Sequence, residues 1–76
     1  MLSATGRIAA ELLRRAASDP DRTIRPMPVF SELATSVQST RETVSRTVSQ
    51  WEKRGLVKRV DGGLQVVAPH RLEELV

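Results

Sequence analysis

The chain has 76 residues, 39% of them hydrophobic, which is enough for one compact core and therefore for a single domain over residues 1–76. It has no cysteine, which excludes disulfides, thiolate zinc sites and cysteine nucleophiles. It also has neither an apolar run of the roughly 18 residues that a membrane span needs nor a signal-peptide pattern, so we expect a cytoplasmic protein. The net charge is +3, and ten of the twelve cationic side chains are arginine, which suits bidentate contacts with phosphates and guanine edges and favours a polyanionic partner.

A first helix is predicted over residues 5–18, where apolar residues recur at three- and four-residue spacing, with Thr5 as the expected N-cap. The opposite side is interpreted as a solvated face. It carries Arg7, Glu11, Arg14 and Arg15. Residues 19–28 contain three prolines, which favour extended geometry in the residues before them, so we expect a loop with a short extended piece around Ile24.

Two further helices are predicted over residues 29–36 and 40–54. The first would have Val29 as its N-cap, a poor capping residue, and the second would be capped by Ser39 or Thr40. If Ser39 is the cap, Glu42 stands at the third helical position and completes a capping box. Gly55 follows the second helix and suits the left-handed residue that ends many helices.

The helix over residues 40–54 separates into two faces at 100° per residue. Val44, Val48 and Trp51 share an apolar arc, so Trp51 is interpreted as a core residue; a single tryptophan also makes no stacking platform for single strands. A displaced polar arc holds Arg41, Glu42, Ser45, Arg46 and Ser49. One face can therefore pack while the other contacts a partner.

A β-hairpin is predicted next, with strands over residues 56–60 and 64–67 and a turn over residues 61–63, followed by a short helix that starts at Pro69. The order of elements predicts a mainly α fold with a small β-hairpin wing, a winged helix-turn-helix. His70 is interpreted as a surface residue, because no partner stands at metal-ligand spacing. With no phosphate-binding loop, catalytic carboxylate pair or activated nucleophile, the chain is not expected to be an enzyme or to hold a metal or cofactor.

The helix-turn-helix region resembles the signature of Crp/Fnr transcription regulators. The matching segments are Ser31-Glu32-Leu33-Ala34, Ser39-Thr40-Arg41-Glu42-Thr43-Val44-Ser45-Arg46 and Gly55-Leu56-Val57, with Thr5-Gly6-Arg7-Ile8-Ala9 upstream. The resemblance covers nearly all of residues 4–68 and implies sequence-specific binding of double-stranded DNA. Family members normally begin with a sensor β-barrel and a dimerisation helix, so we expect an excised or stand-alone domain whose full-length parent is a homodimer able to contact RNA polymerase.

The resemblance implies that Arg41, Glu42 and Arg46 read bases in the major groove. The chemistry agrees, because arginine donates two hydrogen bonds to guanine, glutamate accepts from cytosine N4, and a serine such as Ser45 can serve either base. The arginine and glutamate are Crp-like and Ser45 is Fnr-like, so we expect a half-site that contains TGA. Two alternatives to base reading remain. Glu42 could be the capping-box partner of Ser39, and Arg41 and Arg46 could be ordinary solvated arginines.

Contacts with the DNA backbone are assigned to a second set of residues. These are Ser39, Thr40, Ser49, Lys58 and Arg59. Residues 38–60 carry six cations against two glutamates, which supports this assignment. Thr40 could instead serve only as a cap, and the two wing cations could only protect a strand edge. The alternative function is a winged helix used solely for protein contact. Trp51 and Gln38 depart from the leucine and glycine usual in the family.

Overall fold

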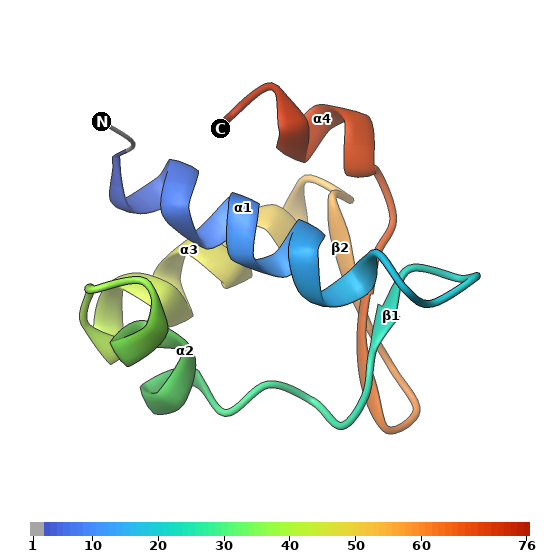
Figure 1. The fold of residues 1–76 in the computed structure, drawn as a ribbon, viewed down its shortest axis with the longest axis horizontal. Helices are drawn as coiled ribbons and strands as arrows, with labels where there is room; N and C mark the ends of the chain where they lie inside the picture. The colour runs from blue at the N-terminus through green and yellow to red at the C-terminus, as the bar shows by residue number, and fades with distance from the viewer. Residues whose placement is uncertain (1–2) are drawn as a thin grey trace.

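The structure, a computed structural model, describes residues 3–76, so the first two residues of the predicted domain lie outside it. The elements in chain order are α1 (Ala4–Ala16), β1 (Thr23–Ile24), α2 (Phe30–Ser36), α3 (Arg41–Lys53), β2 (Val57–Val60), β3 (Gly63–Val66) and α4 (Pro69–Glu73) (Figure 1). Two helices joined by a tight turn precede a β-hairpin. The predicted winged helix-turn-helix architecture is therefore confirmed.

The hairpin belongs to a three-stranded antiparallel sheet of order β1-β3-β2. Val57 pairs with Val66 across the hairpin, and Ile24 pairs with Leu64 on the other side of β3. The extended piece predicted around Ile24 is thus a strand of the wing sheet. Gly63 belongs to β3 and not to the turn, and a Cβ on it would lie 2.3 Å from the carbonyl oxygen of Ile24. A glycine is needed there because β1 passes so close.

The core joins all four helices and the sheet. Its largest fully buried side chains are Ile8, Leu12, Leu33, Leu64, Leu72, Val44, Val48 and Val57. Trp51 is 2% exposed and packs in the same cluster, as predicted. Within residues 3–76, no helix has the length and hydrophobicity that crossing a membrane requires.

The first helix begins earlier and ends earlier than predicted. Ser3 is its N-cap, and its Oγ accepts a hydrogen bond from the backbone N–H of Gly6 at 3.1 Å, so the expectation of Thr5 was wrong. The helix ends at Ala16, ahead of Pro20. Periodicity alone did not distinguish two capping residues that lie so close together in the sequence.

The ends of α2 and α3 share one backbone arrangement, the Schellman motif. At the end of α3, the N–H groups of Gly55 and Leu56 donate to the carbonyls of Glu52 and Trp51, and Gly55 has φ +75°, as predicted for a left-handed residue. At the end of α2 the left-handed residue is Gln38, with φ +55°. The two motifs set the directions in which α3 and β2 begin.

Candidate nucleic-acid interface

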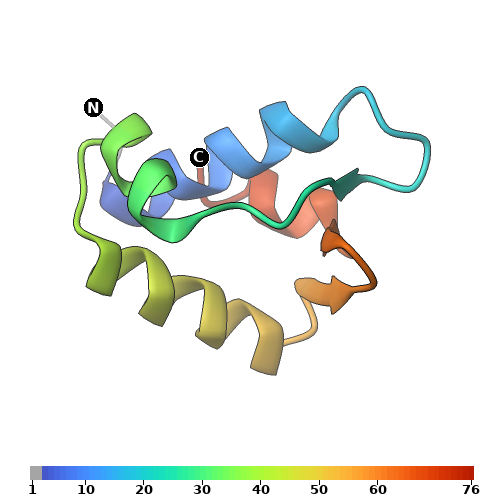
Figure 2. The same ribbon diagram turned by 90° about the horizontal axis from the view of Figure 1, so that it is seen from below.

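Helix α3 runs along one side of the molecule, from the turn after α2 to the hairpin (Figure 2). Thr40 caps it, because its Oγ1 accepts a hydrogen bond from the N–H of Thr43 at 3.1 Å. The capping box between Ser39 and Glu42 does not form. The carboxylate of Glu42 is therefore not engaged at the helix terminus, which removes its structural alternative.

The predicted base-reading residues lie together on the free face of α3. They line one shallow surface hollow made by Arg41, Glu42, Ser45 and Arg46. Ser45 is half-buried and the other three are exposed. Within residues 3–76, none of these four side chains makes a hydrogen bond or an ion pair with the protein, so their donors and acceptors face solvent.

The opposite side of α3 is fully packed. Val44 and Val48 have no exposed surface, and Trp51 follows them on the same arc. The separation of the two arcs predicted from the sequence is thus confirmed. A packed apolar side holds the helix in place while the polar side remains available to a partner.

Arg41 is the first residue of α3, where the helix dipole presents partial positive charge. A cation at that end is unfavourable by about 0.3–1 kcal/mol, and no carboxylate within residues 3–76 pairs with Arg41 to offset this. A local arrangement that costs stability is typical of a functional site. A bound anion such as a phosphate, or an acceptor such as a guanine edge, would supply the missing partner.

The two wing cations have different surroundings. Lys58 is exposed on β2 and has no ion-pair partner among the described residues. Arg59 donates from Nε to both carboxylate oxygens of Glu52 at 3.1 Å, and its guanidinium lies 5.9 Å from the centre of the Phe30 ring. Arg59 thus connects the wing to α3 and to the start of α2, a role that sequence reasoning missed.

The remaining predicted contact residues lie beside this face. Ser39 and Ser49 are half-buried and Thr40 is exposed. Oγ1 of Thr40 caps α3 and its hydroxyl donates to Oγ1 of Thr43 at 2.9 Å, so contact with a phosphate requires this hydroxyl to turn away from Thr43. His70 is exposed and lies 3.6 Å from a carboxylate oxygen of Glu73. Among the described residues, no group of three or more histidine, cysteine, aspartate or glutamate side chains could hold a metal ion.

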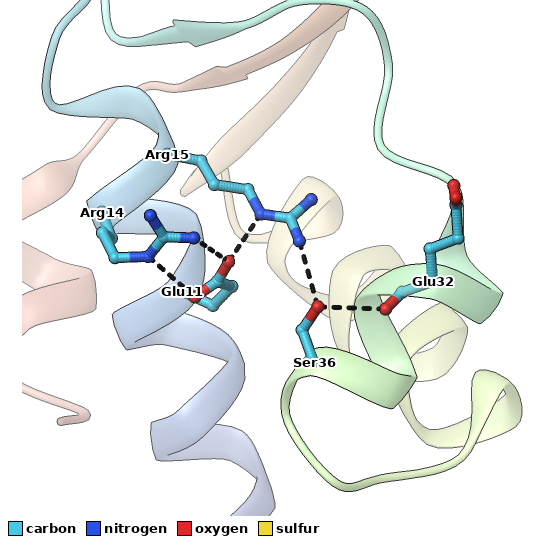
Figure 3. A network of polar contacts seen from close by, with 5 residues as sticks. All are labelled: Glu11, Arg14, Arg15, Glu32 and Ser36. Carbon is cyan, nitrogen blue, oxygen red and sulfur yellow. Dashed lines mark hydrogen bonds and ion pairs between the residues drawn. The ribbon is translucent and has the colours of Figure 1, made fainter.

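The face of α1 that was interpreted as solvated partly contacts α2, which corrects that prediction (Figure 3). Arg15 donates to a carboxylate oxygen of Glu11 at 2.7 Å and to Oγ of Ser36 at 3.3 Å. Ser36 in turn donates to the carbonyl oxygen of Glu32. Arg14 bonds only within α1, and this hydrogen bond is the largest cause that holds the pKa of the Glu11 carboxyl below its ordinary value; desolvation opposes it and Arg15 supports it.

Comparison with known proteins agrees with this geometry. The family model described as a Crp-like helix-turn-helix domain matches residues 6–75. Among solved structures, the chain is similar to the catabolite activator protein of Thermus thermophilus, with a TM-score of 0.77 and 29% sequence identity over 95% of this chain. The chain spans only 33% of that protein's length. No curated protein sequence matches it.

Proposed function

Since the chain belongs to the Crp-like helix-turn-helix domain family, we propose that it is the operator-reading domain of a bacterial transcription regulator. In this proposal it binds double-stranded DNA sequence-specifically, with α3 in the major groove, which at about 12 Å wide admits a helix. The observation that carries the proposal is the hollow lined by Arg41, Glu42, Ser45 and Arg46, four polar side chains that have no partner within the described residues.

Each residue has a role that its chemistry allows. Arg41 and Arg46 donate to guanine O6 and N7, Glu42 accepts from cytosine N4, and Ser45 contacts a base of either type. Each bidentate contact discriminates against a wrong base by roughly 1–3 kcal/mol. The half-site contains TGA.

A second set of residues positions the domain on the sugar-phosphate backbone. It consists of Ser39, Thr40, Ser49, Lys58 and Arg59. Lys58 is the stronger phosphate donor of the wing, because the Nε of Arg59 is already committed to Glu52. The affinity of these contacts falls as salt rises, since counterions are released from the duplex on binding.

The proposal extends to the whole protein from which this domain comes. That protein acts as a homodimer in the cytoplasm, reads two half-sites about one helical turn apart, and contacts RNA polymerase. The domain itself needs no metal or cofactor to bind DNA and catalyses no reaction. A single copy binds weakly, because it reads only one half-site.

The test is a selection of bound duplexes from a random pool by the domain fused to a dimerising helix pair. We expect an enriched half-site, and we expect the variant with Arg41→Ala and Arg46→Ala to lose it. A matched control removes the same charge elsewhere, with Arg14→Ala and Arg71→Ala, and should keep the preference. If no sequence is enriched, or if both double variants lose it equally, the proposal of sequence-specific reading is wrong. A protein-contact module would bind its partner whether or not α3 carries arginines.

A further inference from the structure

Arg7, near the start of α1, contacts the turn that joins α2 to α3. Its Nε donates to the carbonyl oxygen of Val37 at 2.8 Å, and its Nη2 donates to that of Gln38 at 3.4 Å. Val37 and Gln38 lie 30 and 31 positions after Arg7 in the chain, so the contact is tertiary. No other side chain of the described residues bonds to these two carbonyls.

The turn has two features that such a donor offsets. Gln38 adopts φ +55°, a left-handed conformation that is strained for any residue with a Cβ. The Schellman motif uses the carbonyls of Thr35 and Ala34, and no backbone N–H of residues 3–76 donates to the carbonyls of Val37 or Gln38. The guanidinium of Arg7 therefore supplies charged donors where the turn lacks backbone ones.

The geometry of this turn decides where α3 points. Only residues 37–40 separate α2 from α3, so the dihedral angles of these four residues, the left-handed Gln38 among them, set the direction in which α3 begins. The hollow is lined by the proposed base-reading residues, all of which belong to the first two turns of α3, the end that begins at this turn. The far end of α3 is held separately, through the ion pair of Glu52 with Arg59.

We propose that Arg7 is a positioning residue for DNA reading: by closing the turn between α2 and α3 from α1, it fixes the angle at which the first turns of α3 meet a duplex. This inference rests on the proposed function. In this proposal α1 contributes to base discrimination through Arg7, which acts on the turn and need not contact the DNA itself.

A purely structural role predicts a different result. If Arg7 only stabilised the fold, its removal would lower the melting temperature but leave base discrimination unchanged among folded molecules. Arg14 provides the matched control. It lies on the same helix, carries the same charge and has a side chain 70% exposed, but its hydrogen bonds go only to Glu11.

The experiment compares binding of each variant to the duplex enriched from the random pool and to a scrambled duplex of the same composition, at one salt concentration. All measurements are made at a temperature where circular dichroism shows every variant folded. We expect Arg7→Ala to lower the ratio of the two affinities by roughly fivefold or more, which corresponds to the loss of one bidentate base contact. Its affinity for the scrambled duplex should fall no further than that of Arg14→Ala. Arg7→Lys should restore only part of the ratio, because an ammonium lacks the planar fork.

A second measurement reports the angle directly. Residual dipolar couplings in the DNA-free protein should show α3 reoriented relative to α1 in Arg7→Ala and unchanged in Arg14→Ala. If Arg7→Ala does not fold, the same pair is compared in a Gln38→Gly background, where the turn carries no left-handed strain. Unchanged discrimination together with unchanged couplings would overturn the inference. If the unmodified domain does not distinguish the two duplexes, the proposed function fails, and the couplings alone decide the role of Arg7.

Discussion

Replacing Thr40 by alanine should destabilise the domain without changing its fold. The substitution removes two hydrogen bonds at an exposed helix start: the N–H of Thr43 donates to Oγ1 of Thr40 at 3.1 Å, and the hydroxyl of Thr40 donates to Oγ1 of Thr43 at 2.9 Å. A lost threonine cap costs about 1 kcal/mol, within a range of about 0.5–2 kcal/mol. In a domain of this size, 1 kcal/mol corresponds to a fall in melting temperature of roughly 4–8 °C. Urea and thermal unfolding, followed by circular dichroism without DNA, measure both quantities.

Three control variants separate this cap from the capping box that the sequence also allowed. Thr40→Ser keeps the accepting oxygen, and serine is at least as good an N-cap as threonine, so the stability should not fall. Ser39→Ala should stay within about 0.5 kcal/mol, because its side chain does not bond to the helix terminus. Glu42→Gln removes a first-turn carboxylate that interacts favourably with the helix dipole, and should cost about 0.3–1 kcal/mol without any capping box. If Ser39→Ala destabilises the domain as much as Thr40→Ala, then Ser39 and Glu42 cap the helix, and the carboxylate of Glu42 is not free to read a base.

Three further substitutions test the backbone and the charges of the scaffold. Gln38→Gly should stabilise the domain by up to about 1 kcal/mol in urea unfolding, because glycine adopts the left-handed conformation without strain; a loss of stability would contradict the assignment of strain there. Gly63→Ala should destabilise the domain by about 1–3 kcal/mol or more, roughly the penalty of overpacking, because the Cβ of the alanine would lie 2.3 Å from the carbonyl oxygen of Ile24. An unchanged urea midpoint would refute that contact. The lowered pKa of Glu11, caused first by its hydrogen bond with Arg14, should contribute stability above the ordinary glutamate pKa of about 4.3, and this contribution should disappear as the pH falls through the lowered value. The melting-temperature difference between the unmodified domain and Glu11→Gln should therefore be positive at pH 6 and shrink below about pH 4; a difference that does not change with pH would exclude this linkage.

The order of the elements and the two faces of α3 could be predicted because they depend on periodicity within short segments. Val44, Val48 and Trp51 recur at helical spacing, and the structure buries all three. Helix ends were less predictable. Ser39 and Thr40 are adjacent and both can cap a helix, so only the backbone geometry of each residue shows that Thr40 does so.

The contacts made by arginine were the least predictable feature. Arg7 and Arg15 stand on the polar side of α1, and nothing in their spacing shows that the end of α2 lies beside them. Such a side chain is indistinguishable in the sequence from a solvated one until the packing of the helices is known. The ion pair of Glu52 and Arg59 could have been predicted from the sequence. The sharp turn expected at Gly55 brings residues on either side of it close together.

Under the proposed function, Arg7 and Arg59 hold the helix whose free face would read a duplex. The apolar side of α3 packs against the core along most of the helix, and polar contacts connect its two ends to other elements. One end is joined to α1 through Arg7 and the other to the wing through Arg59. Both contacts use charged donors on the scaffold side, while Arg41 and Arg46 on the free face have no partner among the described residues. The charge that positions α3 and the charge that faces outward from it are therefore carried by different residues, and each can be removed separately to test its part in recognition.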